Sequence, residues 1–226
     1  MNKEIPIVCI NLQRAKERRA MIVKEWVQDR CCPVQFIEAY DRRDVEVGKL
    51  LFDYDSSVAA SYIKRNLTDG EIACITSHAL AINYAKEKQL ASVLIIEDDI
   101  KPLFKDYDEL NSVLSYMSVE FPDSSIAMLQ QEHLTLPYKV EEEKQYFKRV
   151  SRATYGTWSH YLNASIYDSF LEDLLSFKAP ADWHWKKYCN AKQIVTPTIP
   201  LTRHIGKDTY IGNAHRGKAA YREYIE

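Results

Sequence analysis

The stretch Ser92–Glu97, which reads SVLIIE, restricts the fold of this chain more than any other feature. A continuous apolar run of this length between polar neighbours indicates a strand covered on both faces, as in the middle of a sheet. Similar runs at 5–12, 34–39 and 126–129 predict further buried strands, and 161–165 predicts another. A chain with several such strands needs helices on both faces of its sheet.

Amphipathic segments that predict helices alternate with these strands. Apolar residues recur at helical spacing over 14–27, and a helix over 68–88 begins with a capping box formed by Thr68 and Glu71. The remaining predicted elements are a loop with a short helix at 41–66, helices at 107–117, 168–177 and 181–190, and an exposed hairpin or loop at 139–149. The alternation predicts an α/β fold over 1–226 in a single domain, with a mostly parallel sheet and helices on both faces.

Composition excludes several classes of protein. With 226 residues, 46% of them apolar and 27% charged, the chain suits one globular domain rather than a disordered or fibrous protein. A net charge of −2 lacks the basic excess of nucleic-acid binders, so we expect no nucleic-acid partner. Six glycines are too few for a Gly-rich phosphate loop, and no apolar run approaches the length of a membrane span.

The N-terminal residues and the cysteines indicate a cytoplasmic protein. The chain enters a strand at once, without the small-residue cleavage site of a signal peptide. Its five cysteines form no CxxC pair and no Cys/His array with zinc spacing. We therefore expect reduced thiols and no zinc site.

Three carboxylates follow the strongest predicted strand directly: Glu97, Asp98 and Asp99. Carboxylates this close together require a cation, which is a divalent metal, a Lys or Arg partner, or a shared proton. In a continuing strand Glu97 and Asp99 point to one side and Asp98 to the other. The alternative is a solvated strand end at which one aspartate caps the next segment.

Polar groups also follow the first predicted strand. Asn11, Leu12 and Arg14 lie at its end, and Arg18 follows on the predicted helix. Asn and Arg side chains at such a place could bind a nucleotide base and its phosphates. For Arg18 the alternative is an exposed position on the outer face of the helix.

Two further groups of polar residues are candidates for site chemistry. Ser77 and His78 are adjacent on the predicted helix, so they face different directions and cannot form a nucleophile–base pair; this excludes hydrolase chemistry there. Near the C-terminus, His204 and Lys207 flank Gly206, which suits a diphosphate with its metal. The alternative for that segment is a mobile tail.

These segments together resemble glycosyltransferase family 25. IVCINLQRAKERR resembles the opening strand and Arg-rich helix of the family, LTDGEIACITSHALAINYA its second block, and ASVLIIEDDI its Glu-Asp-Asp strand end. ATYGTWSHYLNAS and APADWHW continue the likeness more weakly, and Ala73 stands where the family usually has Gly. The bacterial members act in lipopolysaccharide and lipooligosaccharide biosynthesis, often as galactosyltransferases, and the animal collagen galactosyltransferases are relatives.

The resemblance implies a GT-A type, Rossmann-like domain that binds a UDP-sugar, with galactose as the first candidate, and a divalent cation, Mn²⁺ or Mg²⁺. It implies a nucleotide-sugar half over 1–100 and an acceptor half over 101–226 that includes the C-terminal tail. Asp99 and His204 are the implied metal ligands. The implied donor-binding residues are Asn11, Leu12, Arg14, Arg18, Ser77, His78, Glu97, Asp98 and Lys207.

The family is expected to invert the sugar's anomeric configuration, which requires a base for the acceptor hydroxyl. Asp182 is the predicted base, and its alternative role is the N-cap of the following helix. Trp183 and Trp185 are predicted to stack on acceptor sugars, with core packing as the alternative.

The implied partners are a nucleotide-sugar donor and a glycan or glycolipid acceptor. Any contact with the inner membrane surface would be peripheral, through basic residues of the tail such as Lys218. Two rival functions stay open: a non-catalytic nucleotide-sugar or glycan binding module on the same fold, and another nucleotide-using transferase such as a nucleotidyltransferase.

Overall fold

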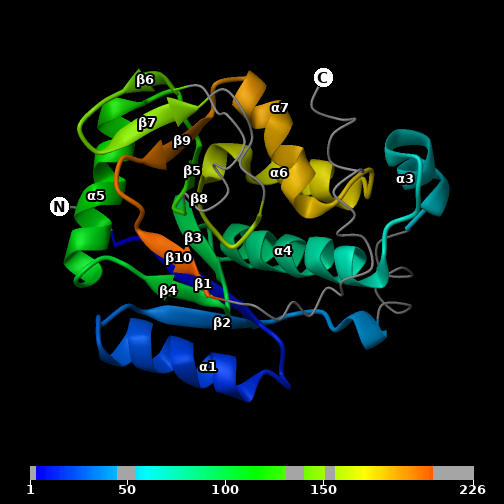
Figure 1. Cartoon of the computed structure of the whole chain (residues 1–226), viewed down its shortest axis with the longest axis horizontal. Coiled ribbons are helices and arrows are strands. Elements are labelled where there is room, and N and C mark those ends of the chain that lie inside the picture. Colours follow the sequence, from blue (N-terminus) through cyan, green and yellow to red (C-terminus); the bar gives the residue numbers. More distant parts are fainter. Residues whose placement is uncertain (1–3, 45–53, 131–139, 151–155, 206–226) are drawn as a thin grey trace.

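A computed structural model of the chain describes residues 4–44, 54–130, 140–150 and 156–205 (Figure 1). The main sheet has eight strands in the order β2-β1-β3-β8-β5-β9-β7-β6, and β10 pairs with β4 in a separate ribbon. The strands are β1 (Ile7–Asn11), β2 (Val34–Glu38), β3 (Ser92–Glu97), β4 (Ile100–Pro102), β5 (Ile126–Met128), β6 (Val140–Glu143), β7 (Phe147–Val150), β8 (Ser159–Asn163), β9 (Ile194–Pro197) and β10 (Thr202–His204). The helices are α1 (Lys16–Ile22), α3 (Ser56–Ile63), α4 (Asp69–Glu87), α5 (Tyr107–Glu120), α6 (Tyr167–Leu175) and α7 (Trp185–Asn190), with short helices η1 (Val23–Gln28), η2 (Arg42–Asp44), η3 (Ala164–Ile166) and η4 (Ala181–His184).

Most strands of the main sheet point in one direction. β2, β1 and β3 are parallel neighbours, and so are β5 and β9. β8 lies antiparallel between β3 and β5, and β7 lies antiparallel between β9 and β6. Only β8 and β7 thus run against the other strands of this described sheet, which confirms the predicted mostly parallel arrangement. The carboxyl ends of β1 and β3 therefore meet at one edge.

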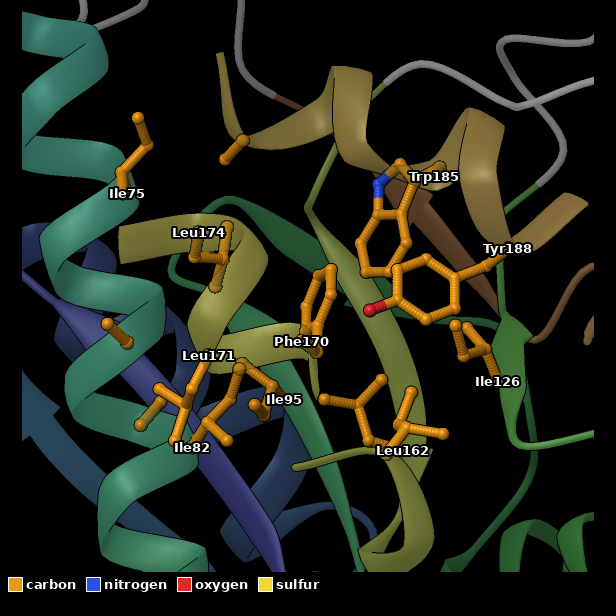
Figure 2. Packing of buried hydrophobic residues seen from close by; sticks show 14 of the residues in the cluster. Ile75, Ile82, Ile95, Ile126, Leu162, Phe170, Leu171, Leu174, Trp185 and Tyr188 are labelled. Atoms are coloured by element: carbon orange, nitrogen blue, oxygen red, sulfur yellow. The ribbon is translucent and has the colours of Figure 1, made fainter. Parts of the chain in front are cut away.

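Helices cover both faces of the sheet, and each face has its own hydrophobic core. Val8 of β1 and Ile95 of β3 face the core under α4 and α6, whereas Ile7 and Ile96 face the core under α1 and α5. This is the strand alternation expected for a sheet buried on both sides. Figure 2 shows the first core, where Phe170 and Leu171 of α6 lie among residues of α4, α7 and the sheet.

The strongest sequence signals are placed correctly. β3 covers the predicted 92–97, and α4 begins at the predicted N-cap Thr68, whose side chain forms the capping box with Glu71. The predicted helix over 14–27 is α1 followed by η1, a π-helical turn in which Trp26 is fully buried and donates from Nε1 to the Ile100 carbonyl at 3.1 Å. The segment over 139–149 is a hairpin of β6 and β7 in which Glu141–Glu143 are exposed.

Among the residues that the structure describes, no helix combines the length and the apolar character needed to cross a membrane. The basic tail residues expected to approach a membrane surface, including Lys218, lie outside the described residues, as does Lys207.

Candidate active site

The carboxyl ends of β1 and β3 bring the predicted polar residues together. Asn11 Nδ2 donates to Asp98 Oδ2 at 2.7 Å, and one guanidinium nitrogen of Arg18 donates to Asp98 Oδ1 at 2.9 Å and to Asp99 Oδ2 at 3.1 Å. Asn11, Asp98 and Asp99 are buried. Burial raises the pKa of Asp98, while the bonds from Arg18 and Asn11 act in the opposite direction. Of the cations predicted for this carboxylate group, the structure supplies an arginine.

Asp99 is held from two sides and keeps one oxygen without a partner. His204 Nε2 lies 3.2 Å from Asp99 Oδ2, on the oxygen that also contacts Arg18. Within the described residues, Asp99 Oδ1 is buried and has no hydrogen-bond partner. A buried carboxylate oxygen without a partner costs free energy unless a donor or cation reaches it. Asp99 and His204 therefore fit a Mn²⁺ or Mg²⁺ site.

Strand pairing explains how His204 reaches Asp99 from far along the chain. β10 runs antiparallel to β4, with His204 opposite Ile100, and the Ile205 amide donates to the Asp99 carbonyl at 2.9 Å. The imidazole stacks on Trp158 with ring centroids 4.1 Å apart and an angle of 14° between the planes. The backbone and the indole together fix the position of the ring.

Glu97 does not share a site with Asp99, contrary to the strand-periodicity prediction. β3 ends at Glu97 and the chain turns, so Asp98 and Asp99 both reach Arg18. Glu97 instead faces α4, where its Oε1 accepts from the Thr157 hydroxyl at 2.6 Å and lies 3.2 Å from His78 Nε2. A turn directly after β3 thus replaces the continuing strand on which that prediction rested.

Asp182 lies on the same side of the sheet as Glu97. Its Oδ2 accepts from the Gly156 amide at 3.3 Å, while the next residue, Thr157, contacts Glu97. Loss of solvation raises the pKa of Asp182 to about 6, and the bond from Gly156 opposes this rise. The caps of η4 and α7 are Pro180 and His184, so Asp182 does not act as the N-cap considered from the sequence.

The two tryptophans after Asp182 differ in their surroundings. Trp185 is fully buried, stacks on Phe170 with centroids 4.6 Å apart, and donates from Nε1 to the Gly156 carbonyl at 3.2 Å (Figure 2). Its ring belongs to the core and has no free face for a sugar, so the predicted acceptor role of Trp185 is wrong and the alternative of core packing holds. Trp183 is partly exposed.

The other predicted donor-binding residues have structural contacts of their own. Ser77 is buried, accepts from the Tyr40 amide at 2.8 Å and donates to the Ala73 carbonyl at 2.7 Å, which ties the loop after β2 to α4. Arg14 is exposed and donates to Asp41 at 2.7 Å. Leu12 accepts at its carbonyl from the amide of Ala15, in the turn that leads into α1.

Thr157 and Trp158 are site residues that the sequence reasoning did not select. Both directly precede the antiparallel strand β8, and the Glu97 amide at the end of β3 donates to the Trp158 carbonyl at 2.8 Å. In the sequence they belong to ATYGTWSHYLNAS, and the signal that could have identified them is the position of this segment beside the Glu-Asp-Asp strand in the sheet.

A family model described as Glycosyltransferase family 25 (LPS biosynthesis protein) matches residues 4–185. The chain belongs to glycosyltransferase family 25. Membership of family 25 supports a glycosyltransferase. The matched range includes every element that contributes to the site except β10, which carries His204.

Curated relatives of this chain match it over part of their length, and one of them is named as a family 25 member. The chain is 30% identical over 98 residues to procollagen galactosyltransferase 2 of Mus musculus and of Homo sapiens, which covers 42% of this chain and 16% of each relative. It is 36% identical over 108 residues to a glycosyltransferase 25 family member of Aedes aegypti, and this match covers 44% of this chain and 17% of that relative. The chain thus matches about a sixth of the length of these relatives.

Two solved glycosyltransferases have similar chain paths. One is a glycosyltransferase involved in the glycosylation of the major capsid of PBCV-1, with a TM-score of 0.47 and 9% identity over 92% of this chain and 95% of that chain. The other is mouse xyloside xylosyltransferase 1 in its apo form, with a TM-score of 0.44 and 11% identity over 83% of this chain and 71% of that chain.

Proposed function

We propose that this family 25 protein is a metal-dependent, inverting glycosyltransferase that moves galactose from UDP-galactose to a glycan acceptor of lipopolysaccharide, lipooligosaccharide or capsule biosynthesis. The observation that carries the proposal is the arrangement of Asp99, which contacts Arg18 and His204 through one oxygen and leaves the other buried without a partner among the described residues. The choice of galactose is supported by the name of the procollagen relatives.

Several residues at the ends of β1, β3 and β10 would take part in donor binding. Asp99 and His204 would hold the divalent cation, with Asp98 oriented beside them by Asn11 and Arg18. When bound, such a cation neutralises negative charge on the diphosphate and so makes UDP a better leaving group. The Arg18 guanidinium is placed to balance the negative charge of Asp98 and Asp99 when the donor is absent.

In the transfer, an acceptor hydroxyl oxygen forms a bond to the anomeric carbon of the donor sugar while the bond from that carbon to the phosphate oxygen breaks. The hydroxyl proton passes to Asp182, and UDP leaves. A general base works best when its pKa lies near the working pH, so the value of about 6 suits Asp182 to this step. The Gly156 amide orients the carboxylate that takes the proton.

Calorimetry with UDP and UDP-galactose tests the donor site, first with Mn²⁺ and then with EDTA. We expect binding that requires the metal and that weakens at least about 100-fold in Asp99→Ala, because the lost carboxylate is a direct ligand. Asp168→Ala is the matched control, since Asp168 is an exposed carboxylate that pairs with Lys86 on the surface. UDP binding that keeps its wild-type affinity in Asp99→Ala, or in the wild-type protein with EDTA, would contradict the proposed site.

Asp182→Asn separates an enzyme from a binding module. If Asp182 is the base, the variant loses turnover and keeps its affinity for UDP-galactose. A nucleotidyltransferase would instead consume a nucleoside triphosphate and release pyrophosphate, which a pyrophosphate assay detects directly.

A further inference from the structure

A second cluster of metal-binding residue types lies on the α4 side of the sheet. Cys74 and His78 are four residues apart on α4, which places them on one face of the helix, and Glu97 approaches them from the end of β3. One ligand atom from each of these residues can be chosen so that all three lie within 4.8 Å of one another. No zinc pattern is visible in the sequence because the third residue comes from another element.

We propose that Cys74, His78 and Glu97 bind a thiophilic divalent cation of the zinc type, at a site separate from Asp99 and His204. A tetrahedral zinc ion with bonds of about 2.0–2.3 Å separates its ligand atoms by about 3.3–3.8 Å. His78 Nε2 and Glu97 Oε1 are already 3.2 Å apart. The sulfur therefore has to move by no more than about 1 Å to complete the set.

The surroundings of the cluster favour a cation. The Thr157 hydroxyl donates to Glu97 Oε1 at 2.6 Å and lies 3.9 Å from Cys74 Sγ, so it orients one ligand and contacts another. Cys74 and Glu97 are partly exposed, which leaves an approach for the ion and room for water as a fourth ligand. Asp182 and Glu71 add negative charge near the sulfur.

Two buried histidine nitrogens beside the cluster have no hydrogen-bond partner within the described part of the chain: His78 Nδ1 and His160 Nε2. The two rings are neighbours, with centroids 5.3 Å apart. His160 Nδ1 lies 2.9 Å from the Thr157 carbonyl, so Nδ1 carries the proton and Nε2 presents a lone pair. His160 Nε2 thus presents a buried lone pair beside the cluster, which a proton donor or a cation would satisfy.

The chemistry of the two sites separates the ions they prefer. A thiolate and an imidazole select zinc-like ions, whereas a site based on a carboxylate and water accepts Mn²⁺ or Mg²⁺ more readily. This inference does not depend on the proposed donor or acceptor, because binding is measured without substrate.

Titration of the full chain with Co²⁺ in a thiol-free reductant tests the proposal, since a cobalt–thiolate bond gives a charge-transfer absorption band. We expect a band that saturates at one equivalent and that Zn²⁺ abolishes. Cys74→Ser should remove the band and weaken Co²⁺ binding at least about 10-fold, the loss that substitutions even outside the ligand set cause. Glu97→Gln, which keeps the thiol, should weaken binding by a similar factor.

Two controls identify the site. Cys189→Ser removes another free, buried cysteine and should leave the band unchanged. Asp99→Ala should also leave it unchanged, because Asp99 belongs to the other site. No saturable band in the wild-type protein, or a band that persists in Cys74→Ser, would overturn the inference; if Cys74→Ser does not fold, full Co²⁺ affinity in Glu97→Gln would overturn it.

Discussion

At the scale of single residues, the raised pKa of Asp182, the proposed base, lowers the stability of the folded chain at neutral pH. Its pKa is about 6 in the folded chain against an ordinary value of 3.8, so the folded state binds its proton more tightly than the unfolded state. The free energy of unfolding therefore falls as the pH rises from about 4 to about 6, by about 3 kcal/mol in total, and stays lowered above that range.

Asp182→Asn is accordingly expected to raise the free energy of unfolding at pH 8 by up to about 3 kcal/mol, and to have no stabilising effect below about pH 4. Denaturant unfolding at the two pH values measures this difference. Asp173→Asn is the matched control: burial raises the pKa of Asp173, but bonds from Lys187 and Tyr188 lower it overall, so this variant should be less stable at pH 8.

The same residue predicts the pH dependence of turnover. Because the base must be ionised, kcat/KM should rise with pH through about 6 and level off above it. Asp182→Asn should lower kcat by about 10²–10⁴-fold. Initial rates of UDP release from pH 5 to 8 provide the profile, and a wild-type profile that is flat across pH 6 would count against Asp182 as the base.

At the scale of elements, α4 depends on its first turn. Thr68 Oγ1 accepts from the Glu71 amide at 3.2 Å, the Glu71 carboxylate accepts from the Thr68 amide at 2.8 Å, and Arg65 holds that carboxylate in place. Since α4 carries Ser77 and His78, the cap also sets the position of the helix at the site.

Thr68→Ala should lower the free energy of unfolding by about 1 kcal/mol, the usual cost of losing an N-cap side chain. Thermal and denaturant unfolding measure the loss. Thr68→Ser keeps the hydroxyl and should stay close to wild type, so equal losses in both variants would show that the methyl group rather than the cap is responsible.

The elements that could be predicted are those whose own residues carry a complete signal. Ser92–Glu97 is apolar throughout, and the capping box marks the start of α4 within four residues. β4 and β10 are three residues each, and β4 ends in a proline, so their formation depends on pairing between distant segments. The strand ends that carry Asn11 and Asp98 could therefore be predicted from the sequence, whereas the turn that separates Glu97 from Asp99 could not.

At the scale of the whole molecule, the sheet separates two cores that share no helix among the described residues. Ile82 and Ile75 of α4 are fully buried on one face, and Ile22 of α1 is fully buried on the other. Side chains on opposite faces of the sheet belong to different cores. A substitution in one core is therefore not expected to change the free-energy cost of a substitution in the other.

Ile82→Val and Ile22→Val should each cost about 0.5–1.5 kcal/mol, and their double variant should equal the sum within about 0.5 kcal/mol. Unfolding in urea gives the three free energies. The pair Ile82→Val and Ile75→Val, within one core, is the comparison. The coupling energy is the difference between the double variant's loss and the sum of the single losses. A coupling energy across the sheet that exceeds the one within the core would contradict the independence of the two cores.

The exposed strand β6 ends the sheet with Glu141, Glu142 and Glu143 in succession. An outer strand offers unpaired backbone groups to any other extended chain. Two copies that approached through this strand would bring like charges face to face, and the repulsion opposes their joining into a continuous intermolecular sheet. The acidic hairpin thus opposes aggregation of the chain through this strand.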